Sequence, residues 1–290
     1  MGVALAHHSA AARKVYDMAE KIRQGTFAQL ENADKAELSI TKNTQPCLFC
    51  VDLAAAEALK ENGIVPDMAA GFSLGEIPAL AFTGVLSHEE AFKLVLTRAN
   101  EMQLCAEETE GGMAAVLGLS TDRVEEICEK TGAFPVNYNC PGQIVVAAKK
   151  ECLPLMVQAV KEAGGRAMLL NVSGAFHTPY MQKAAKALKK QLETCTLHAP
   201  EIPLYSNVTG EVYQQPYAEL IASQAASPVR FQNIVENMAA NGVDTFIEVG
   251  IGKTLCGLIQ KTIKDARTLS VTDVESLNMA ITMLKGENHA

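Results

Sequence analysis

The sequence predicts an α/β protein with a mainly parallel sheet flanked by helices and an inserted ferredoxin-like subdomain. Two observations predict this class. Short apolar strand candidates alternate with helical stretches in the last third of the chain, as they do around parallel sheets. Residues 112–173 carry the element order βαββαβ, which is the split βαβ arrangement. We therefore expect residues 1–111 and 174–290 to form the larger subdomain and residues 112–173 the smaller one.

The first 110 residues are predicted to be mostly helical. Apolar residues recur near helical spacing over 9–22, and a long apolar helix over 45–63 ends in Asn-Gly, a typical C-cap. The short apolar run 68–70 predicts a buried strand. A further helix begins after Ser87, where Glu90, three residues on, completes a capping box.

The pattern changes after the pair Gly111-Gly112. The predicted strands of the insert cover 113–120, 134–139, 143–149 and 166–174, and its helices cover 121–132 and 151–165. After the insert, a helix is predicted over 179–195, with short strands over 202–207, 244–250 and 268–271. These strands and the helical stretches between them indicate a parallel sheet.

Composition excludes several classes of protein. The 290 residues are 48% hydrophobic and carry a formal net charge of −8, so no excess of Lys and Arg is available to neutralise phosphates, and we expect no nucleic-acid partner. No apolar run approaches the roughly 18 residues of a membrane span. The N-terminus lacks the features of a signal peptide, so we expect a cytoplasmic protein with reduced cysteines. The CxxC of Cys47 and Cys50 lacks the second pair that a zinc site needs, so we expect no metal site.

The motif G-x-S-x-G, Gly71 to Gly75, lies between a predicted strand and a helix, which is the pattern of a nucleophile elbow. We expect this turn to be so tight that only glycines fit beside Ser73. It lifts the hydroxyl out of the sheet and points the N-terminus of the next helix at it, where free N–H groups can hold an oxyanion. The alternative is that Ser73 is an ordinary helix N-cap.

A nucleophilic serine needs a base, and His177 is the histidine best placed to act as one. It ends the stretch NVSGAFH after the last strand of the insert, in a loop at a subdomain junction, where clefts form. The alternative is a histidine on a surface loop. Arg98 lies in mid-helix among apolar residues, and is either a snorkelling arginine or a fork that binds a carboxylate. The residues alone leave these alternatives open.

The chain contains, in this order, the segments TQPCLF, GFSLGEIPAL, LTRANEMQ, GGMAAVLGL, VNYNCPGQIVVA, GAFHTPYM, IPLYSNVTG, QAASPVRF and FIEVGIGKTLCGLI. Together they resemble the malonyl-CoA:acyl carrier protein transacylases of fatty acid synthesis and the related acyltransferase domains of polyketide synthases. The resemblance runs nearly end to end. It implies a hydrolase-like fold for the larger subdomain.

The resemblance also implies roles for individual residues. Ser73 would be the nucleophile that carries the acyl group, and His177 would be its base and then the acid for the leaving thiolate. A backbone carbonyl near Gln224 would orient the histidine in place of a carboxylate. Arg98 would pair with the free carboxylate of the malonyl group.

Four further positions match residues that line the site in this family. The N–H of Leu74 would be one oxyanion donor. Gln45 and Asn139 would lie along the site. Phe176 looks like the residue that, in malonyl-specific members, crowds out a branched acyl group.

The implied reaction is a ping-pong transfer through malonyl-serine. The substrates would be malonyl-CoA and the phosphopantetheine thiol of holo acyl carrier protein, with no cofactor, and the protein would be a monomer, as is usual in the family. Carrier proteins are acidic and this chain is net negative, so docking needs a local basic patch. One candidate is the helix with Lys183, Lys186, Lys189 and Lys190, and the alternative is a solvated helix face.

The chain departs from the family pattern at three places. Phe72 stands where members usually have His, and Ile251 replaces the usual proline. The opening MGVALAHHS corresponds to the segment just past the family's first strand and its Gly-Gln-Gly-x-Gln turn, which supplies the other oxyanion donor. We therefore hypothesise that Met1 is an internal methionine of a longer protein. The remaining alternatives are a stand-alone acyltransferase of a polyketide synthase, a serine thioesterase or hydrolase, and an inactive binder of carrier protein.

Overall fold

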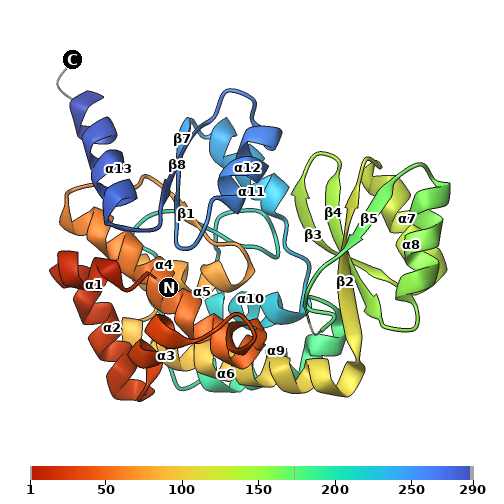
Figure 1. The fold of residues 1–290 in the computed structure, drawn as a ribbon, viewed down its shortest axis with the longest axis horizontal. Helices are drawn as coiled ribbons and strands as arrows, with labels where there is room; N and C mark the ends of the chain where they lie inside the picture. Colours follow the sequence, from red (N-terminus) through yellow and green to blue (C-terminus); the bar gives the residue numbers. More distant parts are fainter. Residues whose placement is uncertain (1, 173, 288–290) are drawn as a thin grey trace.

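The computed structural model describes residues 2–172 and 174–287 (Figure 1). Its N-terminal part is helical, with α1 (Ala4–His8), α2 (Ala10–Ile22), α3 (Thr26–Asn32), the 3-10 helix η1 (Glu37–Ser39) and α4 (Thr41–Glu61). The helices predicted over 9–22 and 45–63 are confirmed as α2 and α4.

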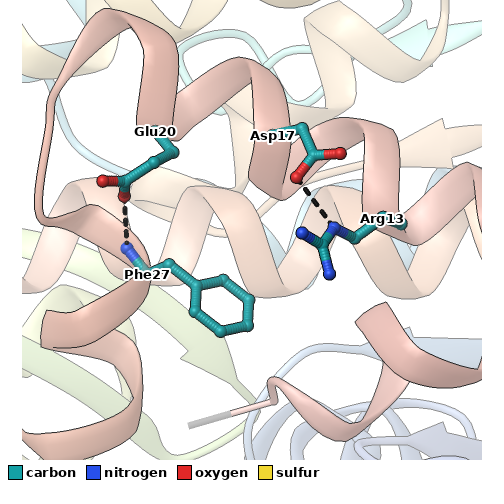
Figure 2. Close-up of polar contacts among 4 residues, drawn as sticks. All are labelled: Arg13, Asp17, Glu20 and Phe27. Atoms are coloured by element: carbon teal, nitrogen blue, oxygen red, sulfur yellow. Dashed lines mark hydrogen bonds and ion pairs between the residues drawn. The ribbon is translucent and has the colours of Figure 1, made fainter.

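The turn from α2 into α3 is held by a side chain (Figure 2). The Glu20 carboxylate accepts the N–H groups of Gly25 and Phe27 at 2.7 and 2.9 Å, which satisfies free donors at the start of α3. These bonds lower the pKa of Glu20. One turn earlier, Arg13 and Asp17 form an exposed i,i+4 ion pair at 2.7 Å.

The chain then enters the centre of the larger part through β1 (Ala69–Ala70), the 3-10 helix η2 (Ser73–Gly75), α5 (Glu76–Phe82) and α6 (His88–Thr109). The predicted strand over 68–70 is confirmed, one residue shorter. The capping box is also confirmed, because the Ser87 and Glu90 side chains each accept the other's backbone N–H. The main hydrophobic core joins α2, α4, α5 and α6 to the later helices α9 (Gln182–Leu192) and α10 (Tyr217–Ser223).

The insert forms the separate lobe drawn in yellow to green (Figure 1). Its elements are β2 (Gly111–Leu117), α7 (Thr121–Thr131), β3 (Phe134–Cys140), β4 (Gln143–Lys149), α8 (Leu153–Glu162) and β5 (Arg166–Leu169). The strands are antiparallel in the order β3-β4-β2-β5, as the predicted βαββαβ arrangement requires. The expected end of the insert, residue 173, lies outside the described residues.

Strands β2, β3 and β4 of the insert's sheet are mostly buried, whereas the edge strand β5 is largely exposed. One face packs under α7 and α8 through Ala114, Val116 and Val146. The other face, with Met113 and Val145, packs on the segment that leaves the insert toward the larger part. The period-two alternation of strand side chains explains this division.

The chain returns to the larger part through the 3-10 helix η3 (Pro179–Met181), α9 (Gln182–Leu192), β6 (Leu204–Tyr205), α10 (Tyr217–Ser223), the 3-10 helix η4 (Gln224–Ala226), α11 (Phe231–Ala240), β7 (Thr245–Val249), α12 (Thr254–Thr262), β8 (Arg267–Val271) and α13 (Val274–Glu287). The predicted helix over 179–195 and the three short strands are confirmed, with β6 shorter than expected.

The parallel character of the larger part is confirmed, because β1 pairs with β6 and β7 pairs with β8, both in parallel. Within the described residues these pairs are two separate two-stranded sheets, where one mainly parallel sheet was expected. The pair of β1 and β6 is short because the chain turns away after Ala70 and Tyr205 into the loops described below.

The two parts are tied together at the edge of the insert's sheet. Val229, which follows η4, pairs in parallel beside β3. Its carbonyl accepts the Tyr138 N–H at 2.9 Å, and its N–H donates to the Val136 carbonyl at 2.8 Å. Pro135 is tolerated in β3 because this strand lies at the edge of the four-stranded sheet.

Candidate active site

The segment from Gly71 to Glu76 forms a strand–turn–helix corner that presents Ser73. Gly71 is required by close approach, because a Cβ there would lie 2.0 Å from the carbonyl carbon of Gly75. Gly75 is not required in this way, since it has a right-handed conformation and a Cβ there would meet open space. The expectation that only glycines fit beside Ser73 is therefore correct at Gly71 and wrong at Gly75.

Ser73 itself adopts a strained conformation. Its φ of 52° lies in the left-handed region, which costs a residue with a side chain about 1–2 kcal/mol. Such strain persists only where surrounding contacts hold the backbone, and it gathers at active sites. Ser73 is therefore not an ordinary N-cap, since its side chain accepts no N–H of the following helix.

The structure brings His177 to Ser73. The Ser73 Oγ lies 2.7 Å from the His177 Nε2. The other ring nitrogen, Nδ1, lies 3.1 Å from the carbonyl oxygens of both Gln224 and Ser227. Carbonyl oxygens can only accept, so Nδ1 carries the proton and Nε2 accepts the hydroxyl hydrogen of Ser73. Gln224 was expected near this position, and Ser227 was missed.

Burial keeps this histidine neutral. His177 is buried, and desolvation lowers its pKa to about 4, helped by the positive charge of Arg98. Its φ of 61° is also left-handed. Thr178 supports this turn by donating its hydroxyl to the Ala175 carbonyl at 2.6 Å. The surface-loop alternative is thus excluded, and the imidazole is in the form that can accept a proton.

Arg98 contacts the same group of residues. Although charged, its side chain is only 1% exposed, which excludes a snorkelling arginine. Its Nη1 donates to the Gln45 Oε1 at 2.6 Å, and its Nη2 donates to the Gln224 Oε1 at 3.0 Å and lies 3.4 Å from the Ser73 Oγ. Burial lowers its pKa to about 10, so the guanidinium stays charged at neutral pH.

The guanidinium is not fully satisfied by the protein. The Arg98 Nε is buried without a hydrogen-bond partner among the described residues. The two terminal nitrogens are held by neutral amide oxygens, although a guanidinium fork matches a carboxylate with two parallel bonds. A carboxylate ligand beside Ser73 would therefore form stronger bonds than the amides of Gln45 and Gln224 provide.

The other expected positions differ in how closely they approach Ser73. Leu74 is buried directly after it, and its N–H has no acceptor among the described residues. Phe176 precedes His177 and packs against the cores of both parts. Asn139 is buried on β3 with its Oδ1 unpaired, and no hydrogen bond connects it to the described site residues.

A polar network behind the serine was missed by sequence reasoning. Asn207, which follows β6, accepts the Ser73 N–H at 2.7 Å and donates to the Gly71 carbonyl at 2.6 Å. The Asn207 N–H and the Tyr213 hydroxyl donate to the buried Glu76 carboxylate at 3.1 and 2.6 Å. Burial raises the pKa of Glu76 to about 7, and these bonds oppose the rise. Asn207 and Glu76 lie in the segments IPLYSNVTG and GFSLGEIPAL, but no local sequence pattern distinguished them from their neighbours.

Two of the four lysines on helix α9 form ion pairs with glutamates. Lys183 pairs with Glu108 at 2.5 Å, and Lys189 pairs with Glu219 at 2.9 Å. Both pairs are exposed and contribute little to stability. The candidate patch for an acidic partner is reduced to Lys186 and Lys190, which form no ion pair with the described residues.

The described residues form neither a reactive CxxC pair nor a metal site. Cys47 and Cys50 lie buried inside α4, where burial raises their thiol pKa values, so neither is a reactive thiolate. Over 2–172 and 174–287, no group of three or more His, Cys, Asp or Glu side chains is arranged to hold a metal ion. No helix in the same ranges has the length and apolar character to cross a membrane.

Known proteins are similar to this chain in sequence and in fold. Residues 1–289 match the acyl transferase domain family. The malonyl CoA-acyl carrier protein transacylase of Bacillus subtilis is 37% identical, over 99% of this chain and 94% of that protein. A crystal structure of the transacylase of that name from Clostridium perfringens superposes with a TM-score of 0.95 at 34% identity, over 99% of this chain and 93% of the other.

A third relative was solved with a partner. It is a malonyl-transacylase in complex with its holo type II polyketide synthase acyl-carrier protein. It superposes with a TM-score of 0.93 at 30% identity, covering 98% of this chain and 94% of the other.

Proposed function

Because this chain belongs to the acyl transferase domain family, we propose that it transfers a malonyl group from malonyl-CoA to the phosphopantetheine thiol of acyl carrier protein in fatty acid biosynthesis, with Ser73 as the covalent carrier. The observation that carries the proposal is the meeting of three groups. The Ser73 Oγ is 2.7 Å from a neutral, buried imidazole and 3.4 Å from a buried guanidinium.

In the first half-reaction, the Ser73 Oγ attacks the thioester carbonyl while His177 Nε2 takes the hydroxyl proton. The carbonyl oxygen becomes an oxyanion, which the N–H of Leu74 would stabilise. Collapse of this intermediate breaks the carbon–sulfur bond. His177 returns the proton to the leaving sulfur, and CoA departs from malonyl-serine.

The second half-reaction repeats these steps in the other direction. The thiol of the carrier protein gives its proton to His177 and attacks the ester carbonyl. The carbon–oxygen bond breaks, and His177 returns the proton to Ser73. Every proton and electron pair is accounted for by the chain's own side chains and two thiols, so the mechanism we propose uses no cofactor.

The histidine works here without a carboxylate partner. The carbonyls of Gln224 and Ser227 fix its tautomer and orientation, but they neutralise a developing imidazolium less than a carboxylate does. A thioester is an activated acyl donor, so a weaker base suffices. This supports acyl transfer from a thioester over hydrolysis of an amide.

Arg98 supports a substrate with a free carboxylate. A malonyl carboxylate would replace the amide oxygens of Gln45 and Gln224 on the guanidinium fork and hold the thioester carbonyl near Ser73. Phe176, beside His177, would limit the room for a branched acyl group. A general serine thioesterase has no use for a buried cation at this position, so the hydrolase alternative leaves Arg98 unexplained.

The carrier protein and the compartment are also part of the proposal. A relative's complex with a holo acyl-carrier protein supports docking of such a carrier on this fold. That carrier serves a polyketide synthase, so service to a polyketide synthase is the second candidate. All eight cysteines are unpaired, which supports work in the reducing cytoplasm.

The test is the intact mass of the protein after brief incubation with malonyl-CoA and an acid quench. We expect a malonyl increment that Ser73→Ala abolishes. Arg98→Ala should lose the increment from malonyl-CoA while keeping reaction with acetyl-CoA. Transfer of the label to holo carrier protein distinguishes the transferase from a hydrolase, which would release free malonate. The absence of any increment on the wild-type chain would contradict the proposal.

A further inference from the structure

The peptide groups on both sides of Ser73 are held by side chains from distant segments. The Ser73 N–H donates to the Asn207 Oδ1 at 2.7 Å, and the Ser73 carbonyl accepts the Gln224 Nε2 at 2.5 Å. The Asn207 Nδ2 also donates to the Gly71 carbonyl at 2.6 Å. The Asn207 amide therefore binds the turn at two points, the Gly71 carbonyl and the Ser73 N–H.

The orientation of this amide is determined by its partners. The Gly71 carbonyl can only accept and the Ser73 N–H can only donate, so a flipped Asn207 amide would lose both bonds. Asn207 is fully buried, and its own backbone is fixed on both sides. Its N–H donates to Glu76 at 3.1 Å, and its carbonyl accepts the Arg230 N–H at 2.9 Å.

We propose that Asn207 is a positioning residue for the transfer reaction: it holds Ser73 in its left-handed conformation and thereby aims the hydroxyl at His177. It touches neither substrate nor the reacting atoms, and acts through the Ser73 backbone. It also occupies the Ser73 N–H, which leaves the N–H of Leu74 as the oxyanion donor of this turn. The proposal rests on the proposed function, since it concerns the rate of the same acyl transfer.

The replacement Asn207→Asp separates positioning from general stability. An ionised carboxylate still accepts the Ser73 N–H, but it repels the Gly71 carbonyl. A protonated carboxyl has the shape and hydrogen-bonding pattern of the native amide, because its hydroxyl can donate to that carbonyl.

Burial and the charged and titratable groups around this position set the pKa of such a carboxyl. Glu76 lies against it from α5, with the Tyr213 hydroxyl on the same carboxylate. Arg98 and His177 lie beyond Ser73, on α6 and before η3, and Arg230 follows from the start of α11. Burial favours the protonated form, and the Glu76 charge adds to this effect above the Glu76 pKa of about 7. The positive charges of Arg98 and Arg230 oppose both.

The experiment measures single-turnover acylation from malonyl-CoA between pH 8 and pH 5, for variants shown to be folded by circular dichroism. Asn207→Ala should slow the limiting rate about 100-fold, the effect of a displacement near 1 Å, with the concentration dependence on malonyl-CoA unchanged. Asn207→Asp should be similarly slow at pH 8. Its rate relative to wild type should rise at least ~10-fold toward pH 5, as the carboxyl takes up a proton.

Asn237→Ala is the matched control. Asn237 also holds the 206–213 loop, through bonds to the Gly210 carbonyl and Glu211 at 2.9 and 3.0 Å, but it does not touch the elbow. It should acylate at the wild-type rate. A folded Asn207→Ala within about threefold of wild type overturns the inference, as does an equal loss in Asn237→Ala. If Asn207→Ala does not fold, the inference is overturned when the acylation rate of Asn207→Asp relative to wild type does not change between pH 8 and pH 5.

A failure of the proposed function is distinguishable from a failure of this inference. If the wild-type chain takes no malonyl group, the same variants are tested with phenylmethylsulfonyl fluoride, which reacts with an aligned serine hydroxyl. Asn207→Ala should then be modified at Ser73 far more slowly than wild type and Asn237→Ala. Equal rates for the three proteins would overturn the inference by this measure as well.

Discussion

Lowering the pH tests whether burial sets the state of the catalytic base. Desolvation lowers the pKa of His177 to about 4. A base with this pKa is still ~90% unprotonated at pH 5, whereas a histidine with the ordinary value of about 6.5 would be ~3% unprotonated. The rate of Ser73 acylation should therefore keep most of its pH 8 value at pH 5. With a histidine of ordinary pKa as the base, the acylation rate would fall about 30-fold from pH 8 to pH 5.

The assay is quenched-flow acylation at malonyl-CoA concentrations well below KM, at pH 8, 7, 6 and 5, read by intact mass. Under this condition the pH dependence of the rate reports the pKa of the base in the free protein, to which the value of about 4 belongs. The malonyl carboxylate stays ionised in this range, because free carboxyl groups titrate near pH 4 or below. A rate that falls about tenfold for each pH unit below 6.5 would refute the reasoning, since it would place an ordinary histidine at the base.

Stability must be followed beside the rate, because two buried groups act on it with opposite signs. The folded-state pKa of His177 is below its unfolded value, so the unfolded chain binds the extra proton. The free energy of unfolding therefore decreases as the pH is lowered from 6.5 to 4. The folded-state pKa of Glu76 is above its unfolded value, so its contribution is fully present below pH 4.5 and is lost as pH rises through 7. Melting curves at each pH ensure that only folded protein is compared.

Three further predictions follow from the site and the elbow. Arg98→Ala should lower kcat/KM for malonyl-CoA by ~10²–10⁴, the value of two charge-assisted bonds at about 1.5–3 kcal/mol each, while acetyl-CoA gains relative to malonyl-CoA; an equal loss for both substrates would contradict carboxylate binding. Gly71→Ala should destabilise the fold by more than about 4 kcal/mol, because its Cβ would lie 2.0 Å from Gly75, whereas Gly75→Ala should melt near the wild-type temperature. Glu76→Gln keeps the acceptor for Asn207 and removes a buried charge, so its stability relative to wild type should rise from pH 5 to pH 8.5, by up to about 3 kcal/mol; a difference that does not change with pH would place the Glu76 pKa at its ordinary value.

The site places a strained residue on each side of the reacting hydrogen bond. Ser73 and His177 both have left-handed backbones, with φ values of 52° and 61°. Ser73 is held by its hydrogen bond to the Asn207 side chain. His177 is held by the carbonyls of Gln224 and Ser227 and by the Thr178 hydrogen bond within the 175–180 turn. The alignment of the two side chains therefore depends on contacts that are formed only in the folded chain.

Local patterns were sufficient for most of the elements. The capping box at Ser87, the helices α2 and α4, and the order of strands and helices in the insert depend on residues a few positions apart, and all were predicted. The strand ends were predicted less accurately: β6 covers two residues of the predicted 202–207, because pairing with β1 decides where it stops. The joining of the parallel pairs into one sheet was expected and is not seen in the described residues.

The sequence by itself determined the chemistry that the site contains: a serine on an elbow, a histidine at the junction of the two parts, and an arginine on an apolar helix. Only the tertiary structure decided that these three meet, that His177 is neutral, and that Arg98 is buried rather than snorkelling. It also revealed Asn207, which lies 134 positions from Ser73 along the chain. The physical reason is that burial and hydrogen bonds across such separations depend on how the two parts pack, and periodicity or spacing within a short segment carries no information about that packing.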